Sequence, residues 1–245
     1  MKNRAFILLA AFLVLLTAGA GPALARADDK GSKGDLKGPA KESDKAAEAF
    51  RDIMGTPDKA IPKKVLDSAE CVAVFPSTIK GGFIVGAQKG NGVVSCRTAN
   101  GWSAPVFLDL SGGSVGAQIG GQSTDYVFLI MNRTGVNHLL SNKFSLGGEA
   151  SVAAGPVGRE AGASTDWKLK AEILSYSRSR GLFAGVELKG VVISTDGSDM
   201  RAVYGGEGNA KDILLDNRRT APAEVQAFPK ELGRYSTAVG EKGRR

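Results

Sequence analysis

The chain has 245 residues, a formal net charge of +7 and a composition that is 42% hydrophobic and 23% charged. A chain of this length and hydrophobic content can bury a core and has the size of one domain. It contains one histidine, His138, and two cysteines. These counts exclude zinc modules with four cysteines, metal sites with several histidines and two-histidine relays. A serine–histidine pair is still possible, and it would have to use His138.

Residues 1–25 carry the pattern of a secretory signal peptide. Lys2 and Arg4 precede an apolar run at residues 5–16, and small residues follow up to Ala23-Leu24-Ala25. A positive start, a short apolar centre and an Ala-x-Ala end are the three parts of such a signal. A membrane anchor is the alternative, but the apolar run is shorter than the ~20 residues that a span needs. We therefore expect cleavage after Ala25 and a periplasmic or secreted product.

The next residues predict a linker followed by two helices. Residues 26–41 are rich in Asp, Lys and Gly and predict a disordered polar linker. Residues 42–54 place apolar side chains three and four positions apart, which predicts a helix with Ser43 as its N-cap and a stop at Gly55. A second, short helix is expected from Pro62 to Ala69.

Residues 71–204 have the pattern of short strands, because β-branched and aromatic runs alternate with Gly, Asn, Asp and Ser. We expect strands at residues 72–75, 82–88, 92–98, 102–109, 114–121, 126–131, 168–178, 182–195 and 201–204. Asn-Gly pairs predict hairpin turns at residues 89–92 and 99–101. Residues 133–140 predict a short helix, and residues 222–235 a helical segment that is interrupted at Pro229.

Glycines also lie inside the predicted strands, where they usually mark a bulge, a bend or a close backbone approach. They predict an α+β fold: a glycine-rich, strongly coiled antiparallel β body, barrel-like or a bent sandwich, with N-terminal and C-terminal helices. We expect a single domain at residues 42–238 and a basic tail at residues 239–245.

Cys71 and Cys96 each lie at one end of a predicted buried strand. In an oxidising compartment two cysteines more often form a disulfide than a reactive pair. We expect a Cys71–Cys96 disulfide, and two separate buried thiols are the alternative.

The sequence carries no dinucleotide-binding, phosphate-loop, metalloprotease, serine-hydrolase or calcium-loop motif. His138 lies beside Leu139 and Leu140, an arrangement more typical of a structural residue than of a catalytic base. The sequence therefore predicts no enzyme, no cofactor and no metal.

Basic residues are the remaining candidates for a binding site. The candidates are Lys63, Lys64, Lys80, Arg178, Arg180 and Lys189. A solvated surface accounts for a net charge this modest, whereas attraction to anionic lipid is worth about 1 kcal/mol per basic residue near a membrane. Nucleic acid is the less favoured polyanion, because the chain is expected to be exported and its aromatic residues lie mostly in apolar runs.

Several motifs together resemble the SYLF domain family, a lipid-binding module that is also described as actin-regulating in its eukaryotic members. In chain order they are V-F-P at 74–76, K-G-G-F-I-V-G at 80–86, G-W-S-A-P at 101–105, G-A-Q-I-G at 116–120, G-P-V-G-R at 155–159 and S-Y-S-R-S-R-G-L-F-A-G at 175–185. The resemblance extends over residues 60–235, and the predicted export signal matches the bacterial members. It implies binding of phosphoinositide or another anionic lipid, and the nearest matching positions are residues 42–54, Lys63, Lys64 and Lys80.

Two classes of function stay open. One is an exported module that binds anionic phospholipid at a membrane surface. The other is a structural or protein-interaction domain of the cell envelope, with a protein partner and no physiological lipid. Export argues against actin as a partner of this chain.

Overall fold

The computed structural model describes residues 35–56, 60–116, 122–158, 171–179 and 181–236. The predicted signal peptide, the predicted basic tail and Arg180 lie outside these ranges, as does most of the predicted linker. All described residues belong to one unit, Ser32–Arg245. No helix in these ranges combines the length and the apolar character needed to cross a membrane.

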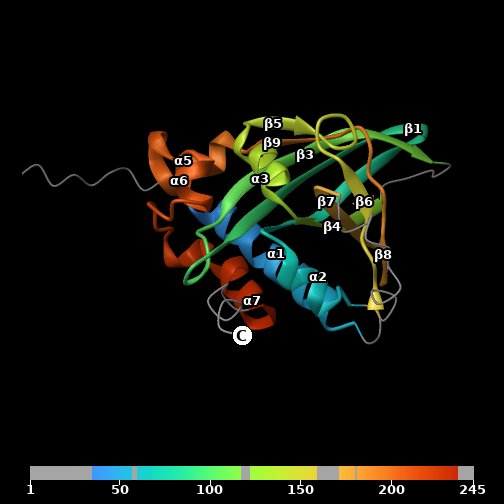
Figure 1. Ribbon diagram of the computed structural model, residues 1–245. Coiled ribbons are helices and arrows are strands. Elements are labelled where there is room, and N and C mark those ends of the chain that lie inside the picture. Colours follow the sequence, from blue (N-terminus) through green and yellow to red (C-terminus); the bar gives the residue numbers. More distant parts are fainter. Residues whose placement is uncertain (1–34, 57–59, 117–121, 159–170, 180, 237–245) are drawn as a thin grey trace, which may run out of the picture. The chain divides into compact units, whose positions relative to one another are not determined.

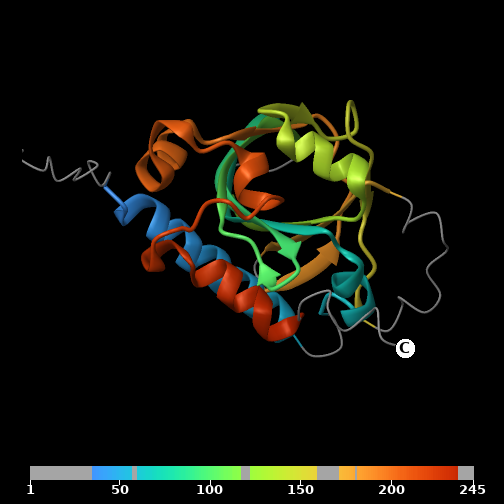
Figure 2. The same ribbon diagram turned by 60° about the vertical axis from the view of Figure 1, so that its left-hand side comes forward.

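A nine-stranded sheet forms the body of this unit, and it curls as Figure 1 and Figure 2 show. The strand order is β5-β9-β3-β1-β4-β7-β6, with β2 paired to β1 and β8 paired to β7. The strands are β1 (Cys71–Thr98), β2 (Gly101–Trp102), β3 (Val106–Gly116), β4 (Gln122–Ile130), β5 (Lys143–Ser145), β6 (Val152–Ala154), β7 (Ile173–Ser179), β8 (Leu182–Gly185) and β9 (Val191–Thr195). The pairs are antiparallel except for β6 on β7. The predicted α+β fold with a coiled, mostly antiparallel sheet is confirmed.

Strand β1 doubles back on itself, so that its first leg pairs with β4 and its second leg with β3. The Glu70 carbonyl accepts a hydrogen bond from the Arg97 N–H at 2.8 Å. One residue further in, the predicted disulfide joins Cys71 to Cys96, whose Cα atoms are 3.9 Å apart. Gly92 lies against the Phe75 ring, and a Cβ at this position would be 2.4 Å from a ring carbon. The interior glycine therefore marks a close approach, as the sequence predicted.

The turn predicted at residues 89–92 is wrong, because these residues lie in the second leg of β1. Asn91 and Gly92 serve cross-strand contacts there: the Asn91 side chain donates to Asp109 on β3, and Gly92 leaves room for a ring. The turn predicted at residues 99–101 is confirmed. It joins β1 to β2, and Gly101 adopts a φ of +131°.

Six α-helices flank the sheet within the described ranges. They are α1 (Lys37–Met54), α2 (Lys63–Ser68), α3 (Arg133–Leu140), α5 (Gly197–Tyr204), α6 (Ala210–Leu214) and α7 (Ala227–Tyr235), with 3₁₀ turns at Gly205–Glu207 and Ala223–Val225. Helices α1 and α7 lie side by side along the sheet (Figure 2), and the Phe50 ring meets the rings of Phe228 and Tyr235 at centroid distances of 6.2 and 5.7 Å.

The first predicted helix exists but begins earlier, at Lys37, and so takes in the last five residues of the predicted linker. Ser43 is not its N-cap. Ser43 is buried inside the helix, where its hydroxyl donates to the Val225 carbonyl at 2.7 Å and accepts from the Phe228 N–H at 3.1 Å. A serine near a helix start can cap the helix or bond to a neighbouring chain segment, and here the tertiary contact decides.

Two other expectations were wrong near the C-terminus. Residues 201–204, predicted as a strand, belong to α5, which begins because the Asp196 carboxylate accepts from the N–H groups of Ser198 and Asp199. Pro229 does not interrupt α7, since it lies in the first turn of the helix, where the N–H that proline lacks has no helical partner.

The remaining elements follow the prediction, and most of them have changed limits. The short helices α2 and α3 are confirmed, and Asn132 caps α3 by accepting from the Gly135 N–H. The predicted strand at 182–195 is split into β8 and β9, with Gly190 at a φ of +74° between them. The short strands β5 and β6 and helix α6 were not predicted.

Candidate functional site

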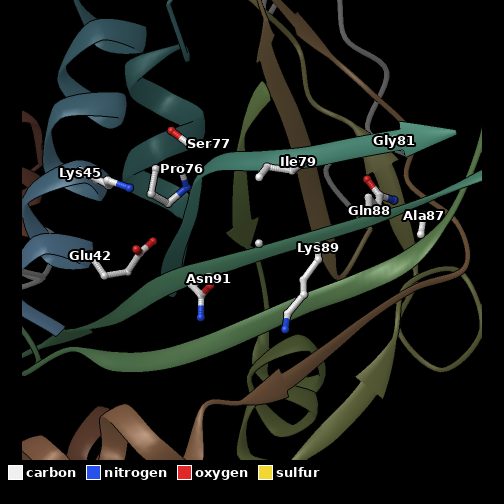
Figure 3. Close-up of a pocket in the computed structure, with 11 residues that line it drawn as sticks. Glu42, Lys45, Pro76, Ser77, Ile79, Gly81, Ala87, Gln88, Lys89 and Asn91 are labelled. Carbon is white, nitrogen blue, oxygen red and sulfur yellow. The ribbon is translucent and has the colours of Figure 1, made fainter. Parts of the chain in front are cut away.

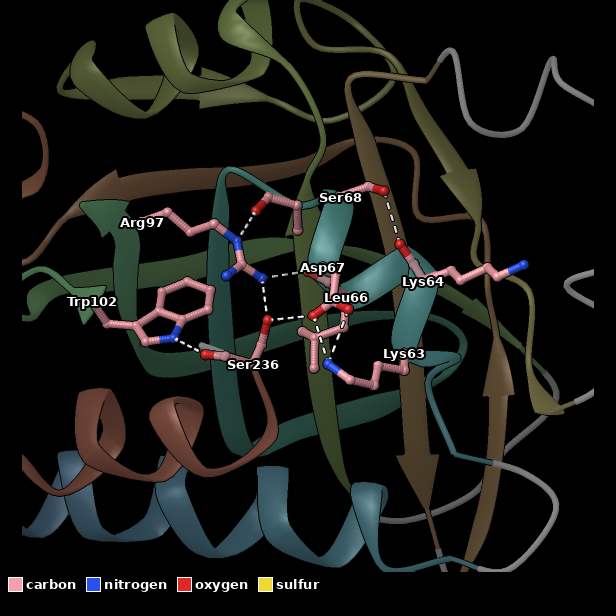
Figure 4. A network of polar contacts seen from close by, with 9 residues as sticks. Lys63, Lys64, Leu66, Asp67, Ser68, Arg97, Trp102 and Ser236 are labelled. Carbon is pink, nitrogen blue, oxygen red and sulfur yellow. Dashed lines mark hydrogen bonds and ion pairs between the residues drawn. The ribbon is translucent and has the colours of Figure 1, made fainter. Parts of the chain in front are cut away.

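Lys63 and Lys64 lie next to each other at the start of α2 and differ in their contacts. The Lys63 ammonium binds the Asp67 carboxylate at 2.9 Å, one helical turn further on, with a side chain that is 70% exposed. Asp67 also accepts a hydrogen bond from the Ser236 hydroxyl at 2.6 Å. In Figure 4 the Lys64 side chain points away from this network. The helix is therefore fixed to the end of α7 through Asp67, and its lysines stay exposed.

The other predicted basic residues lie in separate surroundings. The Lys80 ammonium lies 5.1 Å from the centre of the Tyr126 ring, and burial lowers its pKa. Arg178 binds Asp52 and Asp125 at 2.9 and 3.3 Å, and Lys189 binds Glu187 at 3.0 Å. Among the described candidates, only Lys63 and Lys64 lie together. Each of the others contacts a different group elsewhere in the domain.

A cavity of about 550 Å³ opens between α1 and the two legs of β1 (Figure 3). Its walls include Glu42, Lys45, Pro76, Ser77, Ile79 and Asn91. Figure 3 shows Glu42 and Lys45 reaching from α1 toward the strands. Ile79, at the side of the cavity, and Leu182, at the turn between β7 and β8, are the exposed large apolar residues among those the structure describes.

A β-bulge in the first leg of β1 shapes this cavity. The register of β1 on β4 shifts between Phe75 and Thr78, and Ser77 adopts a φ of +52°. Pro76 has no N–H to give to the ladder, so an irregular position suits it. The Asp125 carboxylate accepts from the Ser77 N–H at 2.8 Å and thereby stabilises the bulge.

The Glu42 carboxylate is the unusual group in the cavity wall. Its Oε1 is covered from solvent and has no hydrogen-bond partner among the described residues. Burial raises the pKa of Glu42 from 4.5 to about 7, while Lys45 and Lys41 oppose the rise and Asp199 and Asp196 add to it. Burial, together with the charges of Asp196 and Asp109, also raises the pKa of Asp199 to about 6. Carboxylates therefore lie close together at this end of the cavity, and each opposes the ionisation of its neighbours.

The raised pKa predicts that Glu42 destabilises the fold at neutral and higher pH. Between pH 4.5 and 7 the unfolded chain loses the Glu42 proton before the folded chain does, so the free energy of unfolding falls across this window. Since Glu42→Gln cannot ionise, its stability relative to wild type should rise by about 1–2 kcal/mol from pH 4.5 to pH 8, after allowance for solvent screening. Urea unfolding at the two pH values measures the difference.

Asp44→Asn is the matched control for this experiment. Asp44 is exposed on the same helix, and its replacement removes the same charge. We expect its stability difference from wild type to change little with pH. A Glu42→Gln profile that runs parallel to the Asp44→Asn profile would show that Glu42 has an ordinary pKa.

This cavity was not predicted from the sequence. Its walls come from α1, from a bulge that no pattern marks and from a segment predicted as a turn. Glu42 was placed at the start of a helix, where a carboxylate is common and carries no sign of burial. Local sequence therefore held no signal for the cavity, which arises only when β1 doubles back under α1.

The described residues form a curled sheet with flanking helices, and the features that a ligand could use are the exposed lysines on α2 and the open cavity. The model of one protein family, described as "Ysc84: Las17-binding protein actin regulator", matches residues 111–235. The chain belongs to this Ysc84 family of SYLF domains, a family of lipid- and actin-binding domains. The resemblance seen in the sequence motifs is thereby confirmed.

The chain is similar to several eukaryotic proteins over most of its length. It is 35% identical to LAS seventeen-binding protein 3 of Saccharomyces cerevisiae over 200 residues. This aligned stretch covers 79% of this chain and 43% of the yeast protein. It is 36% identical to SH3 domain-containing YSC84-like protein 1 of Homo sapiens over 215 residues. This aligned stretch covers 86% of this chain and 62% of the human protein. The chain thus spans less than two thirds of these relatives. The name of the yeast relative and the description of the family both refer to a binding protein, and the prediction that the chain is not an enzyme is confirmed by this kinship.

Proposed function

We propose that the chain is an exported module that binds membranes through anionic lipid headgroups, with phosphoinositide-type headgroups as the class suggested by its family. The observation that carries the proposal is the exposed Lys63–Lys64 pair on α2, in a chain that belongs to a family of lipid- and actin-binding domains.

The contacts of α2 suit this function. An exposed ion pair such as Lys63–Asp67 contributes at most about 1 kcal/mol, so its ammonium can exchange the carboxylate for a lipid phosphate at low cost. Lys64 is exposed and needs no exchange. Because Asp67 and the Leu66 carbonyl connect α2 to Ser236 and to the Arg97 side chain, binding at these lysines would dock the whole domain.

Two observations support export. Residues 1–25 have the pattern of a signal peptide. The disulfide is typical of proteins that fold in an oxidising compartment. Actin regulation is named in the description of the family. Export would separate this chain from cytosolic actin, and an envelope lipid is then the more suitable partner.

Reversal of both α2 lysines should weaken binding to anionic vesicles. Lys63→Glu with Lys64→Glu removes two attractive charges and adds two repulsive ones, each worth about 1 kcal/mol near the surface before salt screening. We expect an affinity loss of about ten-fold or more at 0.15 M salt. Vesicle flotation with anionic lipid measures the loss, and neutral vesicles should show no change.

Lys143→Glu with Lys211→Glu is the control, because it makes the same charge change at exposed lysines of β5 and α6. Lys63→Gln with Lys64→Gln removes the charges without placing a new carboxylate beside Asp67. Equal binding by all variants would contradict a role for α2. Wild-type protein that ignores anionic vesicles even at low salt would favour the second candidate, a protein-interaction domain, which the family description as a Las17-binding protein supports.

A further inference from the structure

The wall of the cavity between α1 and β1 contains a carboxylate oxygen that has no hydrogen-bond donor among the described residues. This oxygen is the Oε1 of Glu42, and it is covered from solvent. Buried polar atoms are nearly always paired, and an unpaired one calls for a ligand, an ion or water. The terminal torsion of a glutamate is broad, so its carboxylate can turn toward a donor that enters the cavity.

Carboxylates lie around this point, and two lysines lie in the same cavity wall. Asn91 also lines the cavity, and its side-chain amide donates to Asp109 and to Asp196 at 3.2 and 3.3 Å, which places two further carboxylates beside the cavity. Lys45 and Lys89 line the same cavity, and the charge of Lys45 favours the ionised form of Glu42, yet the Glu42 Oε1 atom has no hydrogen-bond partner among the described residues. The Oε1 atom of Glu42 therefore lacks a hydrogen-bond donor from within the described part of the domain.

The shape and lining favour an organic cation over a metal ion. A volume of about 550 Å³ lies in the range of small-molecule pockets. Pro76, Ile79 and Ala87 add apolar side chains to the cavity wall. In the described ranges, no group of three or more His, Cys, Asp or Glu residues is placed to hold a metal.

We infer that this cavity binds an organic ammonium group, with the Glu42 carboxylate as its counter-ion and Pro76 and Ile79 in contact with the attached carbon chain. Two sources share this chemistry: a free amine, and the ethanolamine headgroup of a phospholipid. If the ligand is the phospholipid headgroup, the Lys45 ammonium in the cavity wall can bind its phosphate. This inference does not rest on the proposed binding of anionic headgroups at α2.

The test uses the full chain at pH 8, where Glu42 is mostly ionised because its pKa is about 7. Ethanolamine is titrated into the protein by calorimetry, and flotation is measured with phosphatidylcholine vesicles that contain or lack phosphatidylethanolamine. Both vesicles carry no net charge, so attraction to anionic headgroups contributes to neither. Glu42→Gln should weaken binding about ten-fold or more, since it removes a charge-assisted hydrogen bond. Asp44→Asn, the same charge change on the outer side of α1, should bind like wild type.

Saturable ethanolamine binding that Glu42→Gln abolishes supports the inference with a free amine as ligand. Binding only to the vesicles that contain phosphatidylethanolamine, with the same loss, supports it with the lipid as ligand. Absence of both, or equal binding by wild type and Glu42→Gln, overturns it. Lys63→Glu with Lys64→Glu should leave amine binding unchanged, so that failure of this inference and failure of the proposed function are distinguished.

Discussion

Replacement of Arg97 by alanine is expected to lower the free energy of unfolding by about 3 kcal/mol. The Arg97 guanidinium donates to the Ala69 carbonyl at 2.7 Å and to the Leu66 carbonyl at 2.8 Å, both at the end of α2. It also contacts the Ser236 hydroxyl and lies 4.5 Å from the centre of the Trp102 ring (Figure 4). Alanine would leave two carbonyls without their donor and would uncover one face of the indole.

Urea unfolding measures this loss, and the melting temperature should fall by roughly 10 °C for a domain of this size. Arg97→Lys keeps the positive charge but lacks the planar set of donors that reaches both carbonyls, so we expect a loss between those of wild type and alanine. Lys143→Ala, at an exposed position of β5, is the control for the loss of a cationic side chain. An unchanged unfolding midpoint in Arg97→Ala would mean that the Arg97 contacts add no stability and that the Asp67–Ser236 hydrogen bond and packing are enough to hold α2 to the end of α7.

The sequence could predict those parts of the fold whose signals are local. Helix α3 was predicted with its limits, and the structure shows that its cap, Asn132, is also local to the helix. The curled sheet followed from glycines inside strands, and Gly92 against Phe75 shows why such a glycine is needed. Ser43 shows where local reasoning ends, because its partners Val225 and Phe228 lie more than 180 residues away.

The candidate site divides in the same way. Lys63 and Lys64 are neighbours in sequence, so their joint position on one helix could be predicted. The surroundings of Lys80 and Arg178 could not, because Tyr126 and Asp125 reach them only through strand pairing and Asp52 only through the packing of α1 on the sheet. The sequence shows that a residue is basic but does not show which groups it contacts in the fold. Those contacts decide whether its charge is available to a ligand.

Reduction of the Cys71–Cys96 disulfide is expected to lower the free energy of unfolding by about 3 kcal/mol, because the bond closes a loop of 25 residues in the unfolded chain. The bond joins the two legs of β1 next to the Glu70–Arg97 hydrogen bond, so it fixes the base of the hairpin between β3 and β4. Both cysteines are buried, and a reductant therefore reaches the bond only when the hairpin opens.

The measurement compares urea unfolding of the protein refolded with and without a reductant. Mass spectrometry of the non-reduced protein should show no thiol that alkylates. Cys71→Ala with Cys96→Ala is the control: it should unfold near the midpoint of the reduced wild type and should not respond to reductant. Because the hairpin carries the Pro76–Ser77 bulge and the Asn91 wall of the cavity, its loosening should also weaken ethanolamine binding before the domain unfolds. Equal midpoints with and without reductant would show that strand pairing alone closes the hairpin and that the disulfide adds no stability.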